Sequence, residues 1–243
     1  MSSRRRGWFG AGVLAAAALL WQPSGLALQG GNVTVTGTVS LAGAASLDKS
    51  DVVAWLIPVA EGARPRVTGG RRFKIVQQAK RFQPHVLAVS VGSFVDFPNL
   101  DPIFHNVFSL FDGKRFDLGL YEAGTSRGVN FTKAGVCYVF CNIHPEMSAV
   151  VVVVDSPYFT TSTAAGTITI ADVPPGRYRM SLWHERLKPE NAAEYPKDVN
   201  VSTANTSLGT IRMIEAKAAT GPSHTNKFGH EYVPPPSTTP IYP

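Results

Sequence analysis

Four residues near the middle of the chain have side chains that bind soft metal ions. Cys141, His144 and Met147 follow the spacing C-x2-H-x2-M, and His105 lies 36 residues before the cysteine. Two histidines, one cysteine and a weak axial methionine form a mononuclear type 1 copper site, because sulfur suits Cu(I) and imidazole also suits Cu(II). Such a site changes oxidation state with little movement of its ligands. The pattern therefore predicts one copper ion in a carrier of single electrons rather than in a catalyst.

The surrounding segments predict the elements that bring these ligands together. Residues 135–141 and 149–155 are runs typical of strands, and the tight loop 142–148 between them carries two of the ligands. His105 stands at the start of another predicted strand, 106–110. We therefore expect three ligands to converge from the end of one strand and its loop, and the fourth to come from a strand brought alongside.

Two neighbours of the ligands are expected to make the site rigid. Pro145 follows His144 directly, fixes its own backbone φ and restricts the residue before it. A stiff loop loses less conformational entropy when a metal enters. Asn106, next to His105, is expected to hydrogen-bond the ligand loop and fasten the two segments together, as residues behind metal ligands do.

The two cysteines are not expected to form a disulfide, although export favours disulfides. Cys137 and Cys141 lie four residues apart on one predicted strand, which separates their α-carbons by ~13 Å at ~3.3 Å per residue. A disulfide needs less than ~7 Å. Cys137 is therefore expected to be a small buried apolar side chain.

The rest of the chain favours short strands. Gly (22) and Pro (18) are frequent, Val, Thr, Ile and Phe recur in short runs, and no long stretch has the apolar spacing of a helix. The expected fold is an all-β sandwich. Further strands are predicted at residues 33–40, 52–59, 73–77, 85–91, 93–97, 115–120 and 126–131.

Two segments resemble the copper-ligand segments of cupredoxins, the plastocyanin and amicyanin family. They are Gly-Val-Cys-Tyr-Val-Phe-Cys-Asn-Ile-His-Pro-Glu-Met at 135–147 and Phe-Pro-Asn-Leu-Asp-Pro-Ile-Phe-His-Asn-Val at 97–107. The short loop is similar to that of amicyanin, and the chain is also similar to exported proteins labelled methylamine-utilization-like. The resemblance covers about residues 73–155 and implies a Greek-key β-sandwich. It implies these ligand roles: equatorial His105, Cys141 and His144, and axial Met147.

Other metal sites stay open. Cys137, where many cupredoxins have an aromatic residue, gives a C-x3-C spacing like that of the binuclear copper A centre. The interval from Cys141 to His144 is one residue shorter than in that centre. A zinc site with the same ligands is possible, although methionine argues for copper. Six histidines, scattered along the chain, are too few for the trinuclear cluster of a multicopper oxidase.

A second resemblance concerns the remainder of the chain. Residues 166–183, Gly-Thr-Ile-Thr-Ile-Ala-Asp-Val-Pro-Pro-Gly-Arg-Tyr-Arg-Met-Ser-Leu-Trp, are similar to a carboxypeptidase regulatory-like (transthyretin-like) β-sandwich module. Such modules begin with strands like those predicted in 30–58. The cupredoxin segment, 72–155, is then either inserted into a split sandwich or arranged in tandem with it. Residues 156–214 would complete this second sandwich, whose expected role is support or protein contact.

Residues 1–27 are typical of an export signal. Arg4, Arg5 and Arg6 precede an apolar run, and Gly25-Leu26-Ala27 is a small-residue cleavage site. We expect cleavage after Ala27 and a periplasmic or otherwise exported protein, with membrane contact only if the signal is uncleaved. Residues 215–243, rich in Ala, Thr, Ser and Pro, are expected to be a disordered tail.

Charged residues and the other histidines carry weaker predictions. The net charge of +6 does not indicate nucleic-acid binding. Basic residues between 64 and 81 favour a solvated hairpin, or a docking face for an acidic redox partner. His85 and His184 are expected to be structural. Spacing in the sequence identifies no partner that would make Glu122 or Glu185 a catalytic acid, and His224 and His230 belong to the tail.

The combined prediction is a periplasmic electron-transfer protein. His144 is the expected exit point for the electron, and Ile143, Pro145 and Phe104 would form a small apolar docking patch. The expected partner is a redox protein such as a dehydrogenase or a c-type cytochrome. The alternatives are a copper carrier or sensor that does not shuttle electrons, and a β-sandwich scaffold. The sequence does not specify the oligomeric state.

Overall fold

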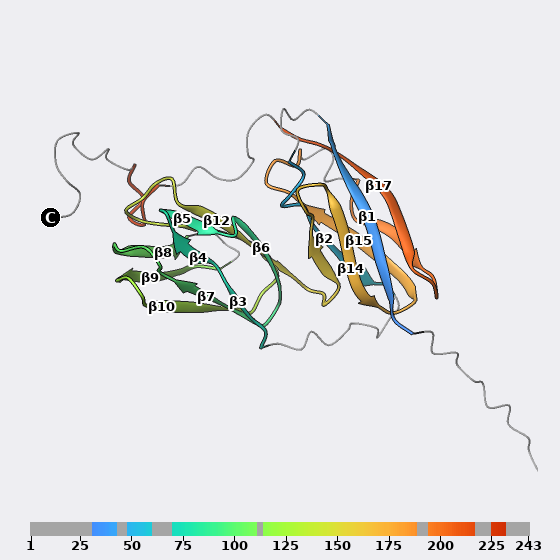
Figure 1. Ribbon diagram of the computed structural model, residues 1–243, viewed down its shortest axis with the longest axis horizontal. Coiled ribbons are helices and arrows are strands. Elements are labelled where there is room, and N and C mark those ends of the chain that lie inside the picture. Colours follow the sequence, from blue (N-terminus) through green and yellow to red (C-terminus); the bar gives the residue numbers. More distant parts are fainter. Residues whose placement is uncertain are drawn as a thin grey trace, which may run out of the picture.

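The fold consists of strands joined by turns and loops. The computed structural model of the protein describes residues 31–42, 48–59, 70–110, 114–188, 194–216 and 225–231. Within these ranges the chain forms seventeen strands and no helix (Figure 1), and so no helix there is suited to crossing a membrane. The prediction of an all-β protein is confirmed. The predicted export signal, residues 1–27, lies outside the described residues.

The first sandwich contains the residues that resemble cupredoxins. A five-stranded sheet in the order β6-β12-β11-β8-β9 packs against a three-stranded sheet in the order β10-β7-β3, and β4 and β5 form a hairpin. The shared core includes Phe97, Phe131, Val139 and Val151. The strands are β3 (Arg72–Lys74), β4 (Val76–Gln78), β5 (Arg81–Gln83), β6 (Val86–Ser90), β7 (Ser93–Pro98), β8 (His105–Ser109), β9 (Phe116–Tyr121), β10 (Ser126–Phe131), β11 (Gly135–Phe140) and β12 (Ser148–Val154).

The second sandwich combines strands from both sides of the first in the sequence. Its sheets have the orders β14-β1-β17 and β13-β2-β15-β16. Buried Ile168 and Ile170 alternate with exposed Thr167 and Thr169 along β14, which is the two-residue period of a strand with one buried face. The strands are β1 (Val33–Ala42), β2 (Val53–Pro58), β13 (Phe159–Thr161), β14 (Thr167–Val173), β15 (Gly176–Trp183), β16 (Lys197–Val201) and β17 (Thr206–Ile214).

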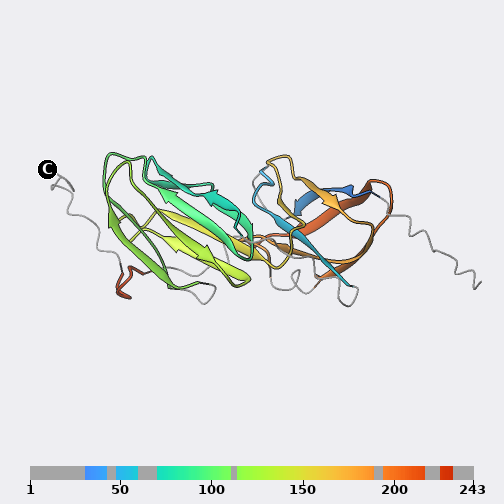
Figure 2. The ribbon, with the colours of Figure 1, turned by 90° about the horizontal axis from the view of Figure 1, so that it is seen from below.

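The pairing of β1 and β2 bears on how the two sandwiches are connected. β1 pairs with β14 and with β17, and β2 pairs with β13 and β15. Neither strand is hydrogen-bonded to any of β3 to β12 in the described sheets. Both views separate the two bodies along the long axis (Figure 2). This is the topology expected for an insertion, while the domain boundaries and the regulatory-like resemblance stay predictions.

The valine-rich strand β12 is buried on both faces. Ala149, Val151 and Val153 belong to the core of the first sandwich. The alternate valines Val150, Val152 and Val154 belong instead to a cluster that includes Val53 of the second sandwich. A strand covered on both sides needs apolar residues at every position, which explains the unbroken run. The second sandwich therefore covers the outer face of the sheet that carries Cys141.

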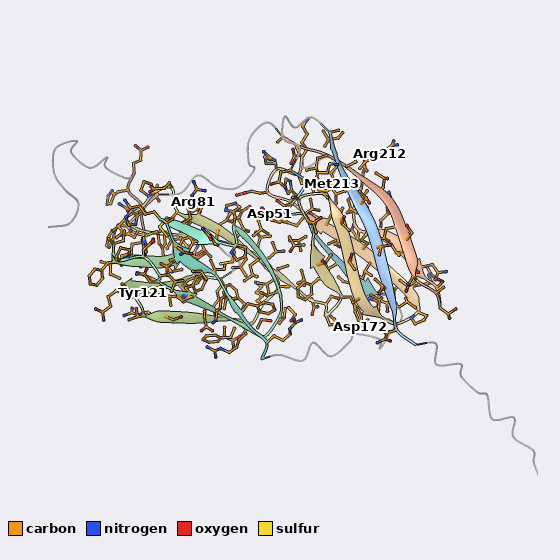
Figure 3. The ribbon with its side chains drawn as sticks, in the orientation of Figure 1. Asp51, Arg81, Tyr121, Asp172, Arg212 and Met213 are labelled. Carbon is orange, nitrogen blue, oxygen red and sulfur yellow. The ribbon has the colours of Figure 1, made fainter. Side chains whose placement is uncertain are left out.

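Polar residues border this apolar junction. The His85 ring, just before β6, lies 2.9 Å from Glu185 Oε2, just after β15. Asp51 lies between the two sandwiches (Figure 3) and is electrostatically coupled to His85 and to His184. Burial raises the pKa of Asp51. The junction thus combines an apolar centre with a titratable border.

Candidate metal centre

Neighbouring strands bring the predicted ligands together. His105 is the first residue of β8, and Cys141 directly follows β11, which pairs with β8 through Phe140 and Phe108. The loop after Cys141 closes on itself, because the backbone N–H of Cys141 donates to the Met147 carbonyl (3.2 Å). The sequence thus positions His105 through strand pairing and the other ligands through one tight loop.

Three side-chain atoms converge within this site. The Nδ1 atoms of His105 and His144 lie 3.1 Å apart, and Cys141 Sγ lies 3.9 Å from the first and 3.7 Å from the second. His105 and Cys141 are completely buried, and His144 is 4% exposed. Among the described residues this is the one group of three or more His, Cys, Asp or Glu side chains close enough to hold a metal ion.

The size of this triangle fits a transition metal. Atoms with these separations share a point about 2.1 Å from all three, close to metal–imidazole bonds of about 2.0–2.1 Å and metal–thiolate bonds of about 2.3 Å. The three residues therefore have the donor types of a copper site and a spacing that fits a first-row transition metal such as zinc or copper.

Asp101 orients the first histidine. Its Oδ2 lies 2.8 Å from His105 Nε2, which leaves Nδ1 facing the other two donors. The backbone N–H groups of Ala79 and Lys80 also donate to this carboxylate, at 2.7 and 2.9 Å. Burial acts to raise the pKa of Asp101, but the hydrogen bonds from Lys80 and His105 outweigh it and lower the pKa. An ionised carboxylate behind a ligand histidine fixes the ring and raises its basicity.

Sequence reasoning missed Asp101. It lies in the turn just before β8, four residues before His105. A carboxylate so close to a predicted ligand was a signal for this role. The hydrogen bonds from Ala79 and Lys80 could not be predicted in this way. These residues form the turn of the β4–β5 hairpin, and the local sequence does not show that this hairpin lies beside Asp101.

Backbone groups surround the cysteine sulfur. Burial raises the pKa of the Cys141 thiol, and the backbone N–H groups of Asn106, Ile143 and His144 oppose that rise by donating hydrogen bonds to the sulfur. Burial, and then the nearby His105, lower the pKa of His144 and favour its neutral, ligating form. The Nε2 atom of His144 is buried without a hydrogen-bond partner. Both residues thus have surroundings that suit ligation more than free ionisation.

The remaining predicted ligand closes the loop. Met147 is completely buried in the same core cluster as Cys141, and its backbone N–H donates to the His144 carbonyl (3.0 Å). These contacts put Met147 at the end of the ligand loop. Its role as the axial ligand stays a prediction.

Asn106 differs from its expected role. Its side-chain amide donates to Asp117 Oδ1 (2.7 Å) on β9 rather than to the ligand loop. The contact with the ligand loop comes instead from its backbone N–H, which donates to Cys141 Sγ. The reason is that β8 pairs with β9, so the Asn106 side chain reaches Asp117 on β9 directly.

Cys137 lies apart from this group of donors. Neither cysteine forms a disulfide, as expected. Cys137 is completely buried and donates to Ser109 Oγ at 3.4 Å, and burial raises its pKa to about 11. A binuclear centre would need this sulfur among the converging donors, and it is not one of them.

The other histidines have structural contacts. His85 contacts Glu185 and the Ser148 carbonyl, at 2.9 and 3.2 Å. His184 Nδ1 lies 3.4 Å from Glu215 Oε1. His230 is exposed and its backbone N–H donates to Asn226, while His224 lies outside the described residues.

Part of the expected tail has a defined structure. Residues 225–231 form a hydrogen-bonded turn, in which Gly229 N donates to the Asn226 carbonyl (2.9 Å). Lys227 contacts the first sandwich through Asn142 and Asp117. The prediction of a disordered tail is therefore wrong for this segment, because polar contacts hold it in place. Residues 217–224 and 232–243 lie outside the described residues.

Comparison with known proteins gives no family assignment. No family model and no curated protein matches the chain. Among solved structures, a purple cupredoxin from Nitrosopumilus maritimus is 26% identical over 33% of this chain and 98% of its own, with a TM-score of 0.31. The copper-containing nitrite reductase of Thermus scotoductus SA-01 is 26% identical over 40% of this chain and 25% of its own, with a TM-score of 0.33. The reduced P94F mutant of amicyanin is 24% identical over 34% of this chain and 82% of its own, with a TM-score of 0.32.

These similar structures are cupredoxins or copper enzymes, and each is similar to less than half of this chain. The TM-scores are too low to carry an argument about function. The functional argument therefore rests on the converging donors of the first sandwich.

Proposed function

We propose that this protein is a mononuclear type 1 copper protein that carries single electrons between redox partners. The observation that carries the proposal is the buried triangle of two imidazole nitrogens and one cysteine sulfur, with the spacing of metal ligands. His105, Cys141 and His144 would be the equatorial ligands and Met147 the axial one. Copper bound there would supply the Cu(I)/Cu(II) couple.

The chain's own residues prepare the site. Asp101 holds the His105 ring in one orientation, and three backbone N–H groups point at Cys141 sulfur. The surrounding core excludes water, since the ligand side chains are almost completely buried. Ligands held in this way need little rearrangement when charge changes, which is the property required of an electron carrier.

Burial of the ligands also favours an electron carrier over a copper carrier. A protein that hands its metal to an acceptor must expose at least one ligand to that acceptor. Here the most exposed of the four, His144, is only 4% accessible. We therefore propose that copper is retained through many redox cycles, and not exchanged.

The surface beside the site suits a transient partner. Phe104 is 46% exposed one residue before His105, and Pro145 is exposed one residue after His144. Ile143, the residue before His144, is partly buried against the first core. Together they form the proposed apolar docking patch for a dehydrogenase or a c-type cytochrome. Because His144 itself is covered, the electron would pass through these neighbouring residues rather than from an open imidazole edge.

The proposed location is the periplasm. It rests on the predicted export signal at residues 1–27 with cleavage after Ala27. In an oxidising compartment, cysteines outside a disulfide need protection from oxidation, and both cysteines are completely buried. Detection of the mature protein in a periplasmic fraction, starting after Ala27, tests this location.

Addition of Cu(II) to the metal-free protein tests the proposed function. We expect one copper per chain and an intense visible band from charge transfer between cysteine sulfur and Cu(II). Stoichiometric copper without a band would contradict electron transfer through a type 1 centre and would favour a carrier. Absence of copper binding would favour a scaffold.

A further inference from the structure

A segment far along the chain lies against the metal-binding end of the first sandwich. Residues 225–231 are the red segment beside the green strands in Figure 1 and Figure 2. Asn226 shapes this segment, because its side-chain oxygen accepts hydrogen bonds from the backbone N–H groups of Phe228 (2.9 Å) and His230 (3.1 Å). The segment therefore presents Lys227 from a defined turn.

Lys227 contacts the ligand loop directly and reaches the strand that carries His105 through Asp117. Its backbone N–H donates to Asn142 Oδ1 (2.8 Å), and Asn142 is the residue after Cys141. Its ammonium group donates to Asp117 Oδ2 (2.8 Å). The other oxygen of Asp117 accepts from the side chain of Asn106 (2.7 Å), which is the residue after His105.

We propose that Lys227 is a positioning residue that clamps the ligand loop to strand β8 and so slows the exchange of the metal. This inference rests on the proposed function, because it concerns the same site. Movement of Cys141 and the loop away from His105 would open the ligand triangle. Lys227 opposes that movement, since one contact holds the loop and the other holds the β8–β9 pair.

The chemistry of the clamp makes it sensitive to salt. The side chains of Lys227 and Asp117 are 27% and 39% exposed, and ions in solution screen such pairs. Exposed ion pairs make modest contributions, so loss of the ammonium group should change opening rates by about two- to fivefold. A rigid structural contact within the core would show no such dependence.

The main experiment uses the full-length copper-loaded protein and the variant Lys227→Met, which keeps the backbone N–H and the apolar stem. The matched control is Lys197→Met, which removes a lysine that lies over Tyr195 in the second sandwich. Transfer of copper to an excess of chelator is followed at low and high salt. We expect release from Lys227→Met to be about two- to fivefold faster at low salt. High salt should accelerate the wild type and Lys197→Met towards that rate.

A second readout needs no metal. Hydrogen exchange of the metal-free protein is measured for peptides that cover residues 105–109 and 141–147. We expect Lys227→Met to exchange faster in both, with an unchanged melting temperature, and Lys197→Met to match the wild type. If no copper binds, the proposed function fails and hydrogen exchange alone decides the clamp. Equal exchange in all three proteins, or release that is equally fast in all three, would overturn it.

Discussion

The two sandwiches differ in what their buried polar side chains do. The core of the second includes apolar residues such as Leu56, Ile168 and Met213, and His184 and Glu215, which are also buried there, lie 3.4 Å apart. The core of the first includes Cys141, and at that end it also buries His105 and Asp101. Burial of polar groups costs free energy unless they are paired, so a fold keeps them where they have another use. Among the described residues, the first sandwich alone brings buried side chains together as a group of metal-binding donors.

Cys141→Ser should have the largest effect on the first sandwich. Serine lacks the soft sulfur that binds copper and produces the charge-transfer band, so we expect the visible band to disappear completely. Absorption of the Cu(II)-loaded variant measures this. The matched control is Cys137→Ser, which should keep the band; its loss in that variant would favour a binuclear centre.

Ile168→Ala should change stability without changing the metal site. Ile168 is completely buried in the second core, so truncation should lower the free energy of unfolding by about 2–5 kcal/mol. Chemical denaturation measures the change, and the absorption spectrum of the folded variant should match the wild type. An altered spectrum would show that the two sandwiches are not separate in function.

Asp101→Asn should weaken metal binding while the fold is kept. The variant removes the negative charge behind His105, and loss of such a partner typically lowers metal affinity about 10–100-fold. Competition with a chelator gives the affinity. The control is Asp172→Asn, at an exposed carboxylate of the second sandwich (Figure 3); an equal loss there would remove the role assigned to Asp101.

His85→Gln should have the smallest effect, on the junction. The hydrogen bond that His85 donates to the Glu185 carboxylate raises the pKa of His85, although burial opposes the rise, and the same bond lowers the pKa of Glu185. The pair thus stabilises the fold above the ordinary pKa of glutamate. It stops doing so as the pH rises through the raised pKa of His85.

We therefore expect His85→Gln to lower the free energy of unfolding most near pH 5–6.5, and less at higher pH. The expected loss is about 0.2–1 kcal/mol, because the pair is partly exposed. Thermal melts across this range provide the measurement. A difference that does not vary with pH would rule out the ion pair as its cause.

Local sequence was sufficient to predict much of the candidate site. Cys141, His144 and Met147 lie on one loop whose spacing limits how the chain can turn, and the flanking strands have clear apolar patterns. His105 could be added because its own strand was recognisable. The all-β fold followed from the same short strands and turns.

Contacts between distant segments could not be predicted in this way. The valine run of β12 indicated a strand, but the sequence did not show why both faces of that strand are apolar. The second face is apolar because it packs against Val53 and its neighbours in the second sandwich. Lys227 has no local signal, because its contacts are with Asn142 and Asp117, 85 and 110 residues away. Composition alone therefore predicted disorder where polar pairing gives structure.

The central claim is that His105, Cys141 and His144 hold one copper ion that changes oxidation state and stays bound. The most direct test takes the Cu(II)-loaded protein through repeated reduction by ascorbate and reoxidation, with a chelator present in excess. Bound copper and the visible band are followed in the same sample. The account predicts a band that bleaches and returns with one copper per chain after every cycle. Loss of copper to the chelator in the first cycle, or bound copper without a band, would contradict it.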